Sequence, residues 1–416
     1  MRFDTVIIGG GLSGLLCGIR LQKAGKKCAI ISAGQSAMHF SSGTFDLLDR
    51  LPDGTPVAEP LKEMDSLPPA HPYKVLGKES VTKYAIEAPA FLEECGIRTT
   101  GSALKNSWRM TPTGERKATW LTISDFTPLS SEDECIGKKV LIANFQGYLD
   151  FNTKFIAASL EKHGSHCRCA AIQMEEMERL RRNPSEMRAT NIARVMDRAD
   201  VLASAAAQIK MLIKDEDTVV LPAVFGLNDA EAPERLRKAI GTKVFLIATM
   251  PPSVPGIRSQ MALRAAFERA GGTFLAGDTV TDADYDADGL VRSIGTYNLG
   301  DIRIMADHFV LASGSFFSKG LAATPDCIYE PVFRTDIIHT HGRDNWFNSN
   351  FFSKQEYISY GVSADSCLRA RIQGKTVDNL YAIGSVLGGA NSLYEGCGGG
   401  IAIITAMAAA DIIAGN

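Results

Sequence analysis

The chain has 416 residues, of which 45% are hydrophobic and 22% are charged, proportions that are typical of an ordinary soluble globular protein. This length exceeds what one hydrophobic core usually organises, so we expect two domains. The net charge of −3 at pH 7 gives no reason to expect a nucleic-acid partner. Nine cysteines without a C-x-x-C pair argue against a secreted disulfide framework and against an iron–sulfur or zinc site.

The two ends of the chain indicate where the protein works. The N-terminus enters a strand pattern directly, without a signal peptide. The longest apolar stretch, residues 401–414, is interrupted by Asp411 and is shorter than the roughly 20 residues that span a bilayer. We therefore expect a cytoplasmic protein that contacts a membrane only through a partner.

The first thirty residues predict a strand, a glycine turn, a helix and a second strand. Phe3–Ile8 is a short β-branched run, Leu15–Ala24 has helical apolar spacing and ends at Gly25, and Lys27–Ile31 is again strand-like. Between them lies G-x-G-x-x-G, the turn that lets a pyrophosphate approach the backbone at a helix N-terminus. The candidate cofactor-binding residues here are Gly9, Gly11, Leu12, Ser13 and Gly14.

The end of the second strand departs from the dinucleotide pattern. A carboxylate is expected there, about 20 residues after the glycines, to hold both hydroxyls of a ribose. The chain has Ser32 instead, followed by Ala33 and Gly34. A serine makes only one such hydrogen bond, so the sequence favours FMN as the cofactor, with FAD as the alternative.

A loop rich in small and hydroxyl residues follows the second strand. Ser41, Ser42 and Gly43 are placed to surround a phosphate or a flavin ring, although an ordinary serine-rich turn has the same composition. His39 is the titratable residue of this loop. It is either an acid/base or flavin-contacting group, or a structural histidine.

Residues 61–255 read as an inserted second domain. A proline-rich stretch precedes it, and it contains strand-like runs at 139–143, 218–222 and 243–247. Arg258 begins the next helix, where its planar cation either clamps a phosphate or carboxylate or lies on the surface.

The last hundred residues repeat the pattern of a strand that runs into a glycine-rich turn. Cys397 precedes the final helix, where it either has a catalytic role or packs around the cofactor. His339 and His341 have the spacing of a metal pair but lack a third ligand, so we predict no metal site. The candidate cofactor-binding residues here are Ser313, Gly314, Gly384, Ser385, Gly388, Gly398 and Gly399.

Several of these stretches together resemble a known family. The turns at residues 9–14, 311–314 and 380–384 resemble two-dinucleotide-binding-domain flavoproteins. Longer stretches are similar to the B subunits of the anaerobic glycerol-3-phosphate dehydrogenases, with the least similarity from about 97 to 250. These stretches are residues 1–7, 39–45, 251–258, 313–317, 383–389 and 396–400.

The resemblance implies a fold and a division of the chain. The fold class is α/β, with a Rossmann-like, FAD/NAD(P)-binding three-layer domain and an inserted second α+β domain. We assign the segments 1–60, 256–330 and 360–416 to the flavin-binding domain. Residues 61–255, with 331–359, form the inserted domain that contacts substrate or other subunits.

The resemblance also implies an activity and partners. Such a complex oxidises sn-glycerol 3-phosphate to dihydroxyacetone phosphate and passes electrons to a quinone. The B subunit is expected to carry FMN beside a catalytic, FAD-bearing A subunit, while an iron–sulfur C subunit docks the pair to the cytoplasmic face of the inner membrane. As candidates for a substrate base and phosphate-binding cations the sequence offers His39 and Arg258, and then Arg334 and His341.

Two other functions stay open from the sequence alone. One is that of an electron-transfer or assembly protein whose flavin never meets substrate. The other is that of a stand-alone flavin oxidoreductase that acts on another small anionic substrate and is active without partners.

Overall fold

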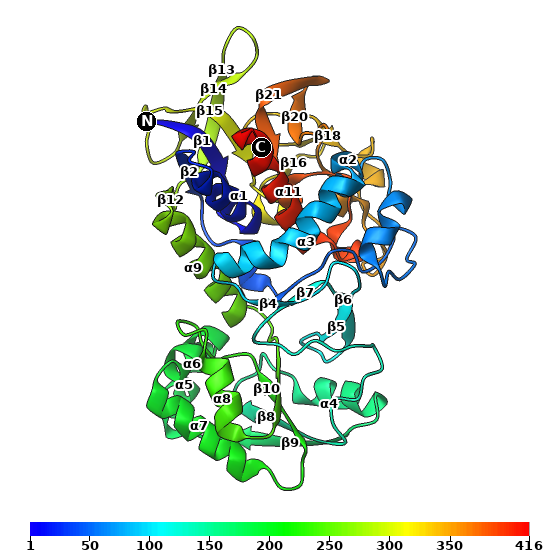
Figure 1. Cartoon of the computed structure of the whole chain (residues 1–416), viewed down its shortest axis with the longest axis vertical. Helices are drawn as coiled ribbons and strands as arrows, with labels where there is room; N and C mark the ends of the chain where they lie inside the picture. Colours follow the sequence, from blue (N-terminus) through cyan, green and yellow to red (C-terminus); the bar gives the residue numbers. More distant parts are fainter. Residues whose placement is uncertain (416) are drawn as a thin grey trace.

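The computed structural model describes residues 1–415 of the chain. Apolar runs from both ends of the chain form one parallel sheet in the upper lobe of the molecule (Figure 1). Its parallel strands, in spatial order, are β12 (Thr273–Ala276), β2 (Cys28–Ser32), β1 (Arg2–Ile8), β15 (Ile304–Leu311) and β21 (Lys375–Ala382). Antiparallel β14 (Val291–Thr296) and β13 (Val280–Tyr285) extend the sheet beyond β15, and β20 (Arg369–Ile372) pairs with β21. This arrangement confirms the predicted Rossmann-like α/β domain.

Four helices of the upper lobe pack against one another. α1 (Leu12–Lys23) contacts α9 (Val254–Arg269) and α11 (Gly398–Ala414), and α11 in turn contacts α3 (Lys78–Glu94). Every residue of α11 from Gly400 to Asp411 is buried, because this helix is apolar on nearly all sides and lies at the centre of the lobe (Figure 1). Among residues 1–415, no helix combines the length and apolar character needed to cross a membrane.

The lower lobe is built on a second parallel sheet. Its strands, in spatial order, are β11 (Lys243–Ile247), β10 (Thr218–Pro222), β8 (Lys139–Phe145) and β9 (His166–Ile172). The crossover helices include α4 (Thr153–Lys162), α7 (Ala199–Leu212) and α8 (Ala232–Ile240). The lobe is therefore mainly layered α/β, where the sequence predicts α+β. The sequence also misses β9, whose alternating polar residues give no strand signal because it is the sheet's edge.

The boundary between the lobes also differs from the prediction. The sequence assigns residues 61–255 to the inserted domain, but buried side chains from Leu61 to Ile123 belong to the core of the upper lobe. The second core extends from Met110 to Val254. The apolar face of α3 packs on α11, so the prolines at residues 52–72 mark an irregular path over the upper lobe and not a domain boundary.

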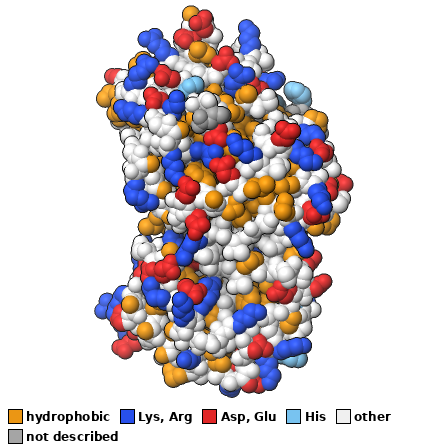
Figure 2. All heavy atoms as spheres, viewed as in Figure 1, with side chains coloured by type: hydrophobic (Ala, Val, Ile, Leu, Met, Phe, Trp, Pro, Cys, Tyr) orange, Lys and Arg blue, Asp and Glu red, His pale blue; other side chains and the backbone are white. Residues whose placement is uncertain are grey.

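Short strands connect the two lobes. β3 (Thr44–Phe45), β7 (Leu121–Ile123) and β4 (Thr99–Gly101) form a small antiparallel sheet below α3, and the β5–β6 hairpin (Ser107–Met110 and Arg116–Thr119) lies beside it (Figure 1). The surface narrows where the lobes meet, and positive and negative side chains are interspersed over the face in view (Figure 2).

Candidate active site

A cavity of about 950 Å³ lies at the carboxyl edge of the upper sheet, where β1, β2 and β15 end. This edge is where open α/β sheets bind their ligands, because the loops after neighbouring strands diverge there. The cavity brings together predicted residues from four separate parts of the chain. Those that line it are Gly9, Gly11, Leu12, Ser13, Ser32, Ser41, Ser313, Gly314, Ser385, Gly398 and Gly399.

The other predicted glycines support the wall from behind. A Cβ on Gly14 would lie 2.0 Å from the carbonyl oxygen of Gly9, and one on Gly384 would lie 2.5 Å from Ser13 Oγ. Gly388 packs equally closely on Gly361, and Gly43 packs on the ring of Phe126. These positions, with Ser42 one residue outside the lining, therefore fix the shape of the cavity and do not form its surface.

Two helix N-termini are directed into the cavity without side-chain caps. α1 follows Gly11 and α11 follows Cys397, and within residues 1–415 no side chain of either cap residue accepts a hydrogen bond from a backbone N–H of the first turn. Gly9, at φ +120°, makes the close turn before α1, where a Cβ would lie 2.2 Å from the Ala312 oxygen. Free N–H groups and the positive end of the helix dipole are suited to an anionic cofactor. Ser313 Oγ is also buried without a hydrogen-bond partner in the described chain.

The cavity continues past the end of β2. Ser32 lines this part of the cavity together with the segments 33–36 and 278–280. The Ser32 hydroxyl donates a hydrogen bond of 3.2 Å to the Gly34 carbonyl. In a dinucleotide site this is the nucleoside end, since it lies one strand away from the phosphate-binding turn. The cavity thus has room on both sides of the pyrophosphate position.

The redox-active ring of a dinucleotide would lie at the opposite end. That end is formed by Ser41, Thr44, Phe45 and the first turn of α11. Phe40 and Phe317, whose rings contact edge to face with centroids 5.2 Å apart, stand at its rim.

His39 lies between two residues that line the cavity, Met38 and Phe40. Its carbonyl accepts a hydrogen bond from the backbone of Ser253 over 2.8 Å, which ties the loop to the start of α9. Burial lowers the pKa of the half-buried imidazole, against a smaller opposite effect of Gln260, so His39 is neutral at pH 7.

Comparison with known proteins identifies the family. A family model described as FAD binding domain matches residues 4–401. A protein of Pectobacterium atrosepticum, named as the B subunit of an anaerobic glycerol-3-phosphate dehydrogenase, is 41% identical over 416 residues, covering 99% of both chains. A protein of the same name from Yersinia enterocolitica is 42% identical over 419 residues, covering 99% of this chain and 98% of the relative. The chain belongs to the B-subunit family of the anaerobic glycerol-3-phosphate dehydrogenases.

Membership of this family makes the chain a flavin-dependent oxidoreductase and confirms the resemblance seen in the sequence. The uncapped helices and the unpartnered serine of the cavity fit a flavin nucleotide. The description of the matched family names FAD, so the expectation of FMN is not confirmed. Among solved structures, the chain is similar to 3-ketosteroid delta1-dehydrogenase from Sterolibacterium denitrificans, at a TM-score of 0.46. The two chains are 11% identical, and the similarity covers 100% of this chain and 99% of that one.

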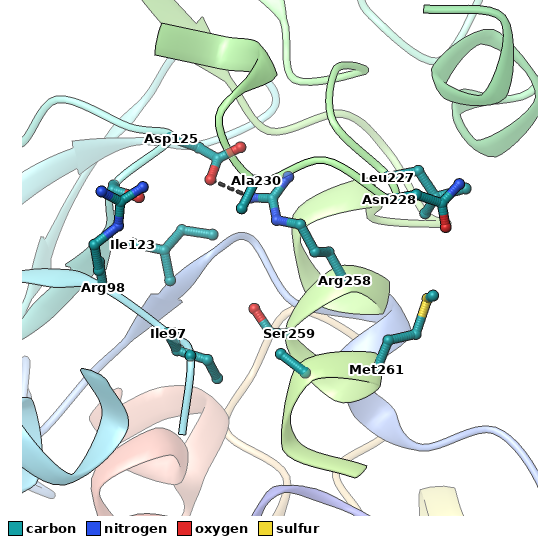
Figure 3. A pocket seen from close by; sticks show the side chains of 13 residues that line it. Ile97, Arg98, Ile123, Asp125, Leu227, Asn228, Ala230, Arg258, Ser259 and Met261 are labelled. Carbon is teal, nitrogen blue, oxygen red and sulfur yellow. Dashed lines mark hydrogen bonds and ion pairs between the residues drawn. The ribbon is translucent and has the colours of Figure 1, made fainter. Parts of the chain in front are cut away.

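Arg258 does not have the predicted place at the flavin. It lines a separate cleft of about 320 Å³ and points from α9 toward Asp125, with which it forms an ion pair (Figure 3). Its guanidinium also donates to the carbonyl oxygens of Phe225 and Gly226. The helix position suggested a free cation, but loops from both lobes accept hydrogen bonds from its two terminal nitrogens, so Arg258 joins these loops and does not face the flavin cavity.

The other predicted cation and the histidine pair have local partners. The Arg334 guanidinium stacks 4.4 Å from the ring centre of Tyr329. His339 and His341 have ring centroids 5.2 Å apart, and His339 Nδ1 lies 3.1 Å from the Ile337 carbonyl oxygen.

Cys397 is completely buried, and this burial raises the pKa of its thiol well above the usual value. It lies 4.0 Å from His71 Nε2, which is 3.3 Å from a Glu395 carboxylate oxygen. His71 Nδ1 accepts the backbone N–H of Tyr73, so Nε2 carries the proton and is not available to a metal ion. The group therefore packs behind the first turn of α11 and has no nucleophilic thiolate.

The sequence does not single out three polar residues at the ring end. Asp46 follows β3, and Arg109 and Lys117 from the β5–β6 hairpin approach its carboxylate to 3.4 and 3.2 Å. The available signal is the alternation of Ser42, Thr44 and Asp46, which places three polar side chains on one face of a strand. Nothing in the sequence indicates that the hairpin, about 60 residues further on, meets this face.

Proposed function

We propose that this chain is the flavin-bearing B subunit of an anaerobic glycerol-3-phosphate dehydrogenase, and that it oxidises sn-glycerol 3-phosphate to dihydroxyacetone phosphate. The observation that carries the proposal is the end-to-end match to relatives of that name, at 41% identity over 99% of both chains. The cavity supports it because its lining comes from the same glycine turns that carry the resemblance.

The reaction is a two-electron oxidation of a secondary alcohol. The C2–H bond breaks and its electron pair leaves with the hydrogen as hydride, the hydroxyl proton goes to a base, and the carbonyl forms. A bound flavin supplies the hydride acceptor. His39 is the candidate base, since it is neutral at pH 7 and its neighbours in the chain, Met38 and Phe40, line the cavity.

We also propose FAD as the cofactor. The lining at Ser32, at residues 33–36 and at residues 278–280 is the room that an adenosine half requires and that FMN would leave empty. Ser32 then binds one ribose hydroxyl in place of the usual carboxylate.

The name of the relatives makes them subunits of a larger assembly. For this chain we propose two partners, a catalytic FAD-bearing A subunit and an iron–sulfur C subunit, with a quinone as the final electron acceptor. Docking to the membrane would then occur through the iron–sulfur partner.

The first test is anaerobic reduction of the purified, flavin-loaded chain. Acid release and mass determination identify the flavin first. We expect sn-glycerol 3-phosphate to bleach the flavin absorbance in the isolated chain, sn-glycerol 1-phosphate to leave it unchanged, and a soluble quinone to restore it.

Bleaching only after the catalytic partner is added would replace the proposal with an electron-transfer role. Bleaching by a different small anion, without partners, would favour a stand-alone oxidoreductase. Failure to hold any flavin after reconstitution would overturn the proposal altogether.

A further inference from the structure

Two cations lie directly behind the ring end of the flavin cavity. Thr44 and Phe45 line that end, and Asp46 is the next residue. The Asp46 carbonyl accepts the backbone N–H of Gly400 over 2.9 Å, so Asp46 is also joined to the first turn of α11. Arg109 and Lys117 contact the Asp46 side chain from the β5–β6 hairpin.

The two oxygens of the Asp46 carboxylate contact different partners at different distances. Oδ1 accepts a hydrogen bond of 2.8 Å from Thr119 and one of 3.3 Å from Thr44. Oδ2 is shared by Arg109 at 3.4 Å and Lys117 at 3.2 Å. Hydrogen bonds between charged groups usually measure about 2.7–2.9 Å. Thr119 therefore fixes the carboxylate, while both cations are held loosely.

The register of the β5–β6 hairpin makes the positions of the two cations energetically unfavourable when no anion is bound. Arg109 and Lys117 are direct cross-strand partners, and like charges placed opposite each other destabilise a hairpin. Their side chains are only 11% and 28% exposed, so water screens the repulsion incompletely. One carboxylate offsets only one of the two positive charges.

Arg109 also keeps a free donor. Its Nε is buried and has no hydrogen-bond partner in the described chain, residues 1–415. A buried guanidinium donor without a partner carries a desolvation penalty that a bound anion would remove. A phosphate group presents several acceptor oxygens and matches the fork of an arginine.

We propose that Arg109 and Lys117 form the anion subsite that binds the phosphate dianion of the substrate, next to the ring end of the flavin cavity. The identity of that substrate as a three-carbon phosphomonoester rests on the proposed function. Asp46, held by Thr119, aligns both cations and limits their affinity, so that a dianion is preferred and a product can leave. Arg109 and Lys117 thus have the role that the sequence assigns to Arg258.

The experiment measures phosphate binding to the flavin-loaded chain by isothermal titration calorimetry, with inorganic phosphate as the probe. Arg109→Met and Lys117→Met remove one cation each and keep an unbranched, flexible side chain. Asp46→Asn removes the competing charge and keeps the shape. Lys105→Met, an exposed lysine just before the hairpin, is the matched control for a general loss of positive charge.

We expect both methionine variants to weaken phosphate binding about tenfold or more, and Asp46→Asn to tighten it several-fold. The control should bind as the unmodified chain does. Unchanged binding in both methionine variants, or weaker binding in Asp46→Asn, would overturn the subsite. Flavin content and the unfolding temperature identify a variant that does not fold. Phosphate binding to the two remaining variants then decides the result.

The outcomes separate this proposal from the proposed function. Loss of phosphate binding in the variants, with no bleaching by sn-glycerol 3-phosphate in any protein, would keep the anion subsite and reject the oxidation. Bleaching with an unchanged KM for sn-glycerol 3-phosphate in both methionine variants would keep the oxidation and reject the subsite.

Discussion

Ser32 shows how one residue at the end of a strand affects the affinity for a nucleotide. A carboxylate there accepts two hydrogen bonds from a ribose, whereas the Ser32 hydroxyl already donates to Gly34 and has one acceptor function left. We expect Ser32→Asp to tighten FAD binding about tenfold. FMN has no ribose, so its dissociation constant should not change. Equal shifts for both flavins, measured by fluorescence quenching, would place the adenosine half elsewhere.

His39 makes a pH dependence testable. Its pKa lies below the usual value of about 6.5, because burial disfavours the charged imidazolium. As the pH falls through this lowered pKa, the base becomes protonated, so the rate of flavin reduction should fall only at a pH below the usual histidine pKa of about 6.5. His39→Gln should slow reduction about 100-fold or more and remove this limb of the profile. His166→Gln, on the exposed edge of the lower lobe, should leave the profile unchanged.

At the scale of single residues the sequence predicts what is local. The glycine turn, Ser32 and the serine loop lie at the cavity because each directly follows a recognisable strand. Arg258 is misplaced because its partners Asp125, Phe225 and Gly226 come from distant segments. Arg109 and Lys117 are missed for the same reason.

Among the elements, α1, α3 and α11 are held together by one ion network. Arg20 on α1 contacts Asp411 on α11 through Nε at 2.5 Å and Nη2 at 2.8 Å, and it contacts Glu87 on α3 at 2.6 Å. Tyr84, also on α3, donates to the same Asp411 carboxylate over 3.0 Å. The network fixes the last helix, whose first turn forms the cavity wall, relative to the glycine-turn helix.

This network predicts a loss of stability on substitution and at low pH. Asp411→Asn leaves Arg20 without its main partner and should lower the free energy of unfolding by about 3 kcal/mol. Burial alone would raise the pKa of Asp411, but Arg20 outweighs it and holds this pKa below the usual value. The stabilisation is therefore present above about pH 3.9 and is lost as the pH falls through the lowered pKa.

Urea unfolding at neutral pH and at about pH 3 measures both effects. Glu94→Gln breaks the exposed pair with Lys23 and should change the stability by less than about 1 kcal/mol. A similar loss in both variants would mean that the Asp411 network contributes no more than a surface pair.

Helices and buried strands with clear periodicity could be predicted from the sequence, whereas edge elements could not. β1, β2, β8, β10 and β11 are continuous apolar runs. β9 is an edge strand in which the polar His166 and Arg168 alternate with two cysteines, so it has no apolar run.

In the whole molecule, Arg258 joins the two lobes. It contacts Asp125, which follows the small sheet of the upper lobe, and two carbonyl groups of the lower lobe. Arg237 of the lower lobe donates to the Asp125 carbonyl, and Arg98 pairs with Glu231 across the same cleft. These contacts set the position of the lower lobe beside the flavin cavity.

We expect Arg258→Met to leave Asp125 buried without a countercharge and to destabilise the chain by about 3 kcal/mol or more. Cleavage by a protease should then occur in the segments that connect the lobes, while the flavin content stays unchanged because Arg258 lies outside the cavity. Arg264→Met is the matched control, since it removes an exposed pair with Glu268 on the same helix. A loss of flavin in Arg258→Met without new cleavage would contradict this role.

The pairing of β1 with β15 orders events during synthesis. Arg2 lies beside Met305, so the first strand to leave the ribosome waits for a neighbour made about 300 residues later. At about 5–20 residues per second this delay is roughly 15–60 s. The lower lobe has a nearly contiguous core and can close meanwhile, whereas the cavity lacks a wall until α11 has been translated. Flavin binding is thus among the last steps of biogenesis. A chain released before α11 is made would lack the complete cavity and could not hold the cofactor.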